Sequence, residues 1–252
     1  INQIRVMVEL NYLQAVPLGG FNYDNCIRNT ALMAQTKAGA KMSYTKTGTT
    51  ICGVVFNGGV CLAADTRATA GSIVADKNCE KLHKLAPNIF CAGAGTAADC
   101  DHVTEMIKRD LELHRFNTHS ESRVQMAVGR LSKHVFGYGG HIGAHCIVGG
   151  VDVKGPQLIE VGADGHHKPG PFLTMGSGSL AAMAILETDY REGMTQQEAE
   201  ALVVKAIEAG VYHDLGSGSN VDVCVIKRGK VEYKRPVKSD NFKLFAKPDG
   251  YQ

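Results

Sequence analysis

Thr49 follows Gly48 at the start of an apolar segment, and this position could give one residue two reactive groups. If the peptide bond between Gly48 and Thr49 is cut, Thr49 carries both a hydroxyl nucleophile and a free α-amine. An α-amino group has an unperturbed pKa of about 7.7–8.0, so near neutral pH it can accept the hydroxyl proton without a histidine. The alternative is that Gly48-Thr49-Thr50 merely opens a strand, because β-branched residues favour strands.

Two charged residues follow Thr49 at equal steps along the chain. Asp65 lies as far after Thr49 as Lys81 lies after Asp65. Taken by themselves, a lysine and an aspartate most often form a solvated ion pair. Their combination with Gly48-Thr49 favours a chemical role over that ordinary alternative.

The elements that must hold these residues are predicted as antiparallel hairpins. Residues 49–56 and 60–66 are apolar runs, and Asn57-Gly58-Gly59 between them tolerates positive φ, which is typical of a tight turn. Two further hairpins pair residues 144–148 with 157–161, and residues 221–226 with 230–233.

Helices are predicted between these hairpins from the 3.6-residue period of apolar side chains. The three stripes are Val103, Met106, Ile107 and Leu111; Val124, Ala127, Val128, Leu131 and Val135; and Ala199, Leu202, Val203, Ala206, Ile207 and Gly210. Thr195-x-x-Glu198 forms a capping box before the third stripe. The alternation fits an α+β fold of two stacked antiparallel sheets with helix pairs outside, although periodicity alone does not separate this layout from other α+β folds.

The composition is that of an ordinary globular protein of one domain or at most two. The chain has 252 residues, of which 44% are hydrophobic and 21% charged, and its net charge is +2. This mild charge argues against nucleic acid or a membrane surface as a partner. The sequence has no apolar run of membrane-spanning length and no signal-peptide core, so we expect an intracellular protein.

The eight cysteines include no Cys-x-x-Cys pair, so reduced thiols are expected. His141, His145 and Cys146 are close in sequence, but no second cluster completes a four-ligand set. We therefore expect no metal site.

Six short segments along the chain contain the residues discussed above or further motifs. They are Lys46–Thr50, Ala64–Thr69, Ala75–His83, Gly93–Asp99, Met175–Ser179 and Asp214–Asn220. Together they resemble the catalytic beta subunits of the eukaryotic proteasome core particle, most closely the trypsin-like kind, which are N-terminal nucleophile hydrolases. The resemblance runs from about Thr45 to Pro236, and Gly19–Cys26 is similar to the propeptide of that kind of subunit.

The resemblance implies a four-layer αββα sandwich and a division of the chain into three parts. Residues 1–48 would be a propeptide removed by self-cleavage between Gly48 and Thr49, residues 49–236 a catalytic domain, and residues 237–252 a short C-terminal tail. The family's trypsin-like kind normally carries a longer C-terminal arm than this.

The resemblance also implies a role for each site residue. Thr49 would be the nucleophile, its own amine would shuttle the proton, and Lys81 beside Asp65 would tune the transfer. The N–H of Gly95 would receive the developing oxyanion, a type of contact worth about 10²- to 10³-fold in rate. Three residues would support the threonine amine: Ser177, Asp214 and Ser217.

Specificity would come from the pocket beside the threonine. Gly93 matches the position whose side chain sets the depth of this pocket, and Asp101 matches an acidic residue toward its floor. Cleavage after Arg or Lys is therefore expected. The other expected substrate-binding residues are Thr69, Cys79 and Ala97. The ordinary alternatives are a turn glycine at 93 and an exposed acid in the first turn of a helix at 101.

Two rival functions remain open. Gly93-x-Gly95-x-x-Ala98 superficially matches a dinucleotide-binding turn, and Gly176-x-Gly178-x-x-Ala181 repeats the pattern, but the strands are predicted as antiparallel hairpins and not as βαβ units. A non-catalytic subunit of the same ring is the second rival, and it would be expected to lack Thr49, Asp65 or Lys81.

The resemblance implies no cofactor and a set of protein partners. These would be the other beta and alpha subunits in stacked seven-membered rings, with unfolded, ubiquitin-targeted polypeptides as substrates and a cytoplasmic and nuclear location. We also expect Lys81→Ala to abolish turnover while changing stability little.

Overall fold

The computed structural model describes residues 27, 28, 30 and 47–238. The chain divides into two units, Ile1–Ser43 and Tyr44–Gln252. In the first unit only residues 27, 28 and 30 are described, and they are helical. Most of the expected propeptide, including Gly19–Cys26, and residues 239–252 of the expected tail therefore lie outside the described residues.

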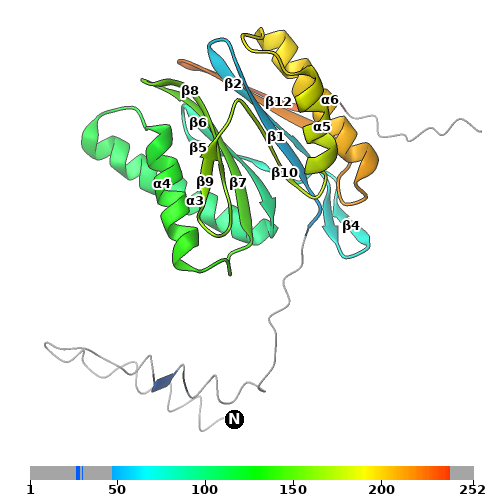
Figure 1. The fold of residues 1–252 in the computed structure, drawn as a ribbon. Helices are drawn as coiled ribbons and strands as arrows, with labels where there is room; N and C mark the ends of the chain where they lie inside the picture. The colour runs from blue at the N-terminus through cyan, green and yellow to red at the C-terminus, as the bar shows by residue number, and fades with distance from the viewer. Residues whose placement is uncertain (1–26, 29, 31–46, 239–252) are drawn as a thin grey trace, which may run out of the picture. The chain divides into compact units, whose positions relative to one another are not determined.

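The second unit is built on two five-stranded antiparallel sheets and a separate two-stranded hairpin (Figure 1). The first sheet has the order β10-β1-β2-β11-β12, and it consists of β10 (Phe172–Gly176), β1 (Thr50–Phe56), β2 (Gly59–Asp65), β11 (Val221–Lys227) and β12 (Lys230–Lys238). The second has the order β5-β6-β7-β8-β9, and it consists of β5 (Leu82–Ala86), β6 (Ile89–Gly95), β7 (Ala144–Asp152), β8 (Gly155–Val161) and β9 (His167–Pro169). The hairpin pairs β3 (Ala68–Ala70) with β4 (Ile73–Asp76).

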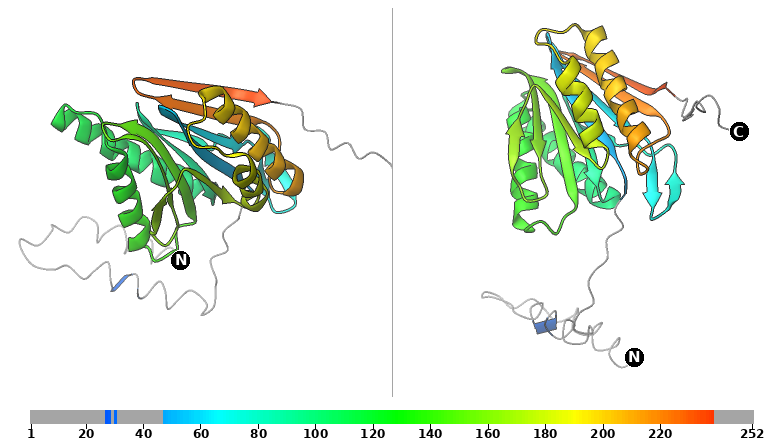
Figure 2. Two further views of the ribbon diagram at one scale, coloured as in Figure 1. Left: turned by 45° about the horizontal axis from the view of Figure 1, so that its top comes forward. Right: turned by 45° about the vertical axis from the view of Figure 1, so that its right-hand side comes forward.

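Four helices in residues 47–238 cover the outer faces of the two sheets (Figures 1 and 2). α3 (Ala97–Thr118) and α4 (Val124–Gly137) cover the second sheet, whereas α5 (Ser179–Asp189) and α6 (Gln196–His213) cover the first. The expected α+β sandwich with four αββα layers is confirmed. Among the helices of the described part of the chain, none combines the length and the apolar composition of a membrane span.

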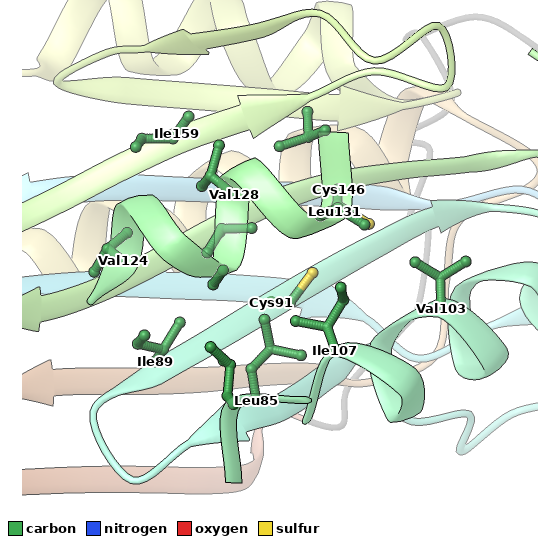
Figure 3. Packing of buried hydrophobic residues seen from close by; sticks show 14 of the residues in the cluster. Leu85, Ile89, Cys91, Val103, Ile107, Val124, Val128, Leu131, Cys146 and Ile159 are labelled. Atoms are coloured by element: carbon green, nitrogen blue, oxygen red, sulfur yellow. The ribbon is translucent and has the colours of Figure 1, made fainter. Parts of the chain in front are cut away.

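Three apolar layers hold the sandwich together. One lies between the second sheet and α3 with α4 (Figure 3), one between the first sheet and α5 with α6, and one between the two sheets. In β2, Cys61 and Ala63 pack toward the helices, while Leu62 and Ala64 pack toward the opposite sheet. Because both faces of such a strand are buried, its sequence is a continuous apolar run and not an alternation.

The predicted hairpins and helices are confirmed. The 49–56/60–66 hairpin is β1 with β2, and the other two predicted hairpins are β7 with β8 and β11 with β12. The capping box also forms, because the Thr195 hydroxyl accepts the Glu198 N–H while the Glu198 carboxylate accepts the Thr195 N–H at 2.8 Å. The apolar period did not reveal α5, whose small and apolar residues leave only Ala182 and Leu186 buried.

The last strand is longer than predicted. β12 continues past Tyr233 and through Pro236 to Lys238, with an irregular register opposite Val221 and Val223. Proline is tolerated there because β12 is an edge strand, where a missing N–H costs no ladder bond. The predicted end of this strand at residue 233 was therefore too early, since residues 234–238 still belong to the sheet. The expected division of the chain at residues 236/237 stays a prediction.

Candidate active site

Thr49 lies immediately before β1, buried at the head of the first sheet. The turn from β10 to α5 contacts the Thr49 backbone, because the Gly178 N–H donates to the Thr49 carbonyl at 3.2 Å. Gly176 has a φ of +99°, and a Cβ there would overlap that same carbonyl. The turn at residues 176–181 therefore permits a close approach to Thr49. It joins an antiparallel strand to a helix and is not part of a βαβ unit, which contradicts the dinucleotide-binding alternative.

Lys81 joins the other two residues of the predicted set. Its Nζ lies 3.0 Å from the Thr49 Oγ1 and 2.8 Å from the Asp65 Oδ1. The Lys81 and Asp65 side chains are 6% and 0% exposed, so they do not form the solvated surface pair that was the ordinary alternative. Lys81 comes directly before β5 and Asp65 ends β2, so the two sheets meet at this pair.

Backbone donors surround the Asp65 carboxylate. Its Oδ1 accepts the Thr50 N–H at 2.9 Å, and its Oδ2 accepts the Gly218 N–H at 3.0 Å and the Arg67 N–H at 3.3 Å. Burial raises the pKa of Asp65, and the Lys81 ammonium together with hydrogen bonds opposes that rise. The carboxylate is thus held in one orientation, with Lys81 as its counter-ion.

The nitrogen of Thr49 has its own hydrogen-bonded support. The Thr49 N–H donates to the Ser177 Oγ at 3.0 Å, and the hydroxyls of Ser177 and Ser217 each donate to the Asp214 Oδ2 at 2.6 Å. Burial alone would raise the pKa of Asp214, but these two hydroxyls and the Gly216 N–H lower it below its ordinary value. The predicted supporting residues are therefore together, arranged around an ionised carboxylate.

The two residues before Thr49 lie across the site. The Thr49 hydroxyl donates to the Gly48 carbonyl oxygen at 2.7 Å, and the Lys81 Nζ donates to the same oxygen at 3.2 Å. The Gly48 N–H donates to the Thr69 Oγ1 at 3.2 Å, and the Thr47 hydroxyl donates to the Gly95 carbonyl at 2.7 Å. The Thr49 hydroxyl therefore faces the Gly48–Thr49 peptide bond.

A pocket opens beside Thr49 and contains most of the predicted substrate-binding residues. It is lined by Cys79, Gly93, Gly95, Ala97 and Asp101 together with Thr49 and Lys81. A side chain at position 93 would point into it, since a Cβ there would lie 3.1 Å from the Cys100 Cβ and 3.5 Å from the His83 Nε2. The predicted Thr69 does not line this pocket, and it contacts the Gly48 backbone instead.

Asp101 lies in this pocket but not at its floor. Its side chain is 69% exposed, whereas the neighbouring Cys100 is buried. The helical turn explains the difference, because α3 directs Cys100 into the core and the next residue toward solvent. Asp101 therefore stands at the rim of the pocket.

Sequence reasoning missed several residues of the site. His83 lies in the pocket wall two residues after Lys81, and the period of two along an extended chain was a signal that could have identified it. Thr47 lies within the Lys46–Thr50 segment, but no role was predicted for it. Arg67, whose NH1 donates to the Leu215 carbonyl at 3.0 Å, had no local signal, because its partner comes from a distant loop.

No group of three or more His, Cys, Asp or Glu residues within the described ranges has the geometry of a metal site, and this holds for His141, His145 and Cys146. The cysteines at 52, 61, 91, 146 and 224 are buried and carry free thiols.

A buried threonine at the head of a strand, contacted by a lysine between two antiparallel sheets, is the arrangement of the N-terminal nucleophile hydrolases. Residues 45–226 match the family described as "Proteasome subunit". The chain is 52% identical over 236 residues to "Proteasome subunit beta type-7-B" of Arabidopsis thaliana, covering 93% of this chain and 85% of the relative. It is also 52% identical over 219 residues to "Proteasome subunit beta type-2" of Saccharomyces cerevisiae, covering 86% and 83%. The chain therefore belongs to the proteasome beta subunit family.

Proposed function

We propose that this chain is a threonine endopeptidase subunit of the proteasome core particle that cleaves unfolded polypeptides after basic residues. The observation that carries the proposal is the buried contact of the Lys81 Nζ with both the Thr49 hydroxyl and the Asp65 carboxylate. A non-catalytic subunit would gain little from this pair, because burying two charges carries a large desolvation cost that favours replacement by apolar residues.

The same contacts support activation from an inactive precursor. While the Gly48–Thr49 bond is intact, the Thr49 nitrogen is an amide and cannot act as a base. Attack of the Thr49 oxygen on the Gly48 carbonyl carbon forms an ester and breaks the C–N bond, and the hydroxyl proton ends on the released amine. Lys81 donates to the carbonyl oxygen that becomes negative during this attack. Water then hydrolyses the ester and frees the Thr49 N-terminus.

In the processed chain, the new amine would take the hydroxyl proton as Thr49 attacks a substrate carbonyl. Ser177 already contacts this nitrogen and is oriented by Asp214. Lys81 keeps a positive charge beside the oxygen, and the Gly95 N–H is the proposed oxyanion donor. The amine returns the proton to the leaving group, and water releases the acyl product.

Cleavage after Arg or Lys is the specificity that the pocket supports. Gly93 leaves the pocket free of a side chain, and Asp101 provides a carboxylate at its rim. A basic side chain could extend past Gly93 and place its charge beside that carboxylate.

Assembly in stacked seven-membered rings with other beta and alpha subunits, in the cytoplasm and nucleus, completes the proposal. It is supported by large apolar side chains that the single chain leaves exposed. These include Leu180, Leu215, Phe136 and Ile73, which are 85%, 84%, 72% and 70% exposed.

The decisive test compares N-termini and hydrolysis in particles that contain this chain, with Thr49→Ala as the variant. The wild-type chain should begin Thr-Thr-Ile-Cys and hydrolyse peptides, whereas Thr49→Ala should keep Gly48 and hydrolyse none through this site. Thr49→Ser is the matched control, because it retains a hydroxyl and should still be processed. Active wild-type chain that retains residues before Thr49 would contradict the amine-as-base mechanism.

A further inference from the structure

The carboxylates of Glu80 and Asp101 both line the pocket, and Glu80 already has partners on β12. The Glu80 Oε1 accepts the Tyr233 hydroxyl at 3.1 Å, and its Oε2 lies 3.4 Å from the Arg235 NH1. The Arg235 Nε lies 3.2 Å from the buried Asp222 carboxylate. Because β12 holds Glu80 in this way, Asp101 is the carboxylate better placed to receive a cation in the pocket.

Asp101 is faced by one titratable ring. The His83 Nε2 lies 3.8 Å from the Asp101 Oδ1, which is beyond hydrogen-bond distance but within reach of an ion pair if the ring is charged. The His83 side chain is 19% exposed, and it lies in the pocket wall next to Gly93. The charge of His83 therefore decides whether Asp101 has a partner.

His83 is neutral in the resting pocket at neutral pH. Burial lowers the pKa of His83 below its ordinary value, and the carboxylates of Asp101 and Glu80 offset this only in part. Because the pKa of His83 lies below the ordinary value of about 6.5, the ring gains its proton only at a lower pH, and protonation then places a positive charge close to Asp101.

Other charged or titratable groups around His83 come from three elements. The segment before β5 contributes Cys79, Glu80 and Lys81, β6 contributes Cys91 as the register partner of His83, and α3 contributes Cys100, Asp101, Glu105 and the exposed His102. Burial raises the pKa of the Cys79 and Cys100 thiols, which keeps these two neutral. Lys81 is paired with Asp65, and Glu80 is held by β12.

We propose that His83 is a specificity-determining residue that switches the pocket between two charge states. Neutral His83 leaves Asp101 available to a basic substrate side chain, whereas protonated His83 pairs with Asp101 and competes with that side chain. The inference rests on the proposed peptidase function and adds a proton-dependent control of its preference for basic residues. Protonation of His83 and binding of a substrate cation compete for Asp101. Acidification therefore raises KM for basic substrates and leaves KM for neutral substrates unchanged.

The test uses two fluorogenic peptides that differ only in Arg or citrulline before the scissile bond, since citrulline is the uncharged isostere of arginine. The ratio of their kcat/KM values cancels pH effects on the threonine chemistry, which both peptides share. Assembled particles with wild-type chain, His83→Gln, His83→Lys or His102→Gln are compared at pH 7.5 and pH 5.5. Cleavage at Gly48–Thr49 reports that each variant has an intact site.

For the wild type, we expect the Arg-to-citrulline ratio to fall about fivefold between pH 7.5 and 5.5, the size expected for a partly exposed ion pair. His83→Gln should hold the ratio constant within about twofold. His83→Lys should show the low ratio already at pH 7.5. His102→Gln removes an exposed neighbouring histidine and should behave as wild type.

A wild-type ratio that does not change with pH overturns the role of His83, and so does an equal fall in wild type and His83→Gln. Failure of the wild type to hydrolyse either peptide at pH 7.5 contradicts the proposed function instead. The two failures are therefore distinguishable in one experiment.

Discussion

The Lys81 Nζ lies 2.8 Å from the Asp65 Oδ1, and both side chains are almost completely excluded from solvent. This relationship links the chemistry of the site to the stability of the fold. The ammonium that contacts the Thr49 hydroxyl is also the counter-ion of a carboxylate buried between the two sheets.

Lys81→Ala should therefore damage both activity and stability. Hydrolysis should fall by about 10²- to 10⁴-fold because proton-transfer assistance is lost. Unfolding should become easier by about 3–5 kcal/mol, because Asp65 is left buried without its partner. This differs from the sequence-based expectation of little change in stability, since burial of the pair was not visible in the sequence.

Denaturant unfolding and peptide hydrolysis, measured on the same preparations, check this prediction. Lys84→Ala removes an exposed lysine of β5 and should change stability by less than about 0.5 kcal/mol. The double variant Asp65→Asn with Lys81→Met should recover stability but not activity. Near-normal hydrolysis by Lys81→Ala would reduce Lys81 to a structural role.

Gly48→Ala should slow self-cleavage without harming the processed enzyme. A Cβ on residue 48 would overlap the backbone of Gly216, so the residue before Thr49 could not stay in its observed position. Appearance of the processed chain over time measures this effect. Gly129→Ala in α4 is the matched control, because a Cβ there meets nothing within 4 Å.

A second comparison uses a chain whose N-terminal Thr49 is produced without self-cleavage at Gly48. It should be as active as wild type, since Gly48 is absent from the processed enzyme. Normal processing of Gly48→Ala would show that the close approach to Gly216 is not needed for cleavage.

Gly93→Met should close the pocket to long side chains, and Asp101→Asn should weaken the preference for basic ones. The first variant places a side chain against Cys100 and His83, and the second removes the carboxylate at the rim. Peptides ending in Arg, Leu and Glu, compared on assembled particles, report both effects. If neither substitution changes the hydrolysis of the Arg peptide relative to the others, the proposed preference for basic residues is wrong. This outcome would not contradict the proposed role of Thr49 as nucleophile.

Stability should depend on pH through Asp222. Burial raises the pKa of Asp222 to about 6, although Arg235 opposes the rise. Because the folded pKa lies above the unfolded value of about 3.9, the folded state binds a proton first, and stability from this group increases as pH falls from 7.5 to 5. Asp222→Asn should lack this increase, which we expect to be on the order of 1–2 kcal/mol.

Unfolding curves of wild type and Asp222→Asn at pH 7.5 and 5 isolate the effect. Groups common to both proteins cancel in the comparison, including His83, whose lowered pKa acts in the opposite direction. An equal pH response in the two proteins would show that Asp222 does not titrate in this range.

Much of the fold could be predicted because its signals are local. Asn57-Gly58-Gly59 marked the first hairpin, and the capping box at Thr195 marked the start of α6. By contrast, α5 was missed because its small and apolar residues do not form a distinct stripe. The extension of β12 through Pro236 was missed because only its edge position makes the proline acceptable.

The order of the elements and the candidate site residues could be predicted from the sequence, because turn residues, apolar periods and the motifs around Thr49, Asp65 and Lys81 are all local. Which charges are buried and which are already paired depends on the tertiary structure. It enclosed Lys81 with Asp65, neutralised Glu80 with Arg235 from β12, and placed His83 opposite Asp101. These outcomes depend on contacts between segments far apart in the chain, and no local pattern carries that information.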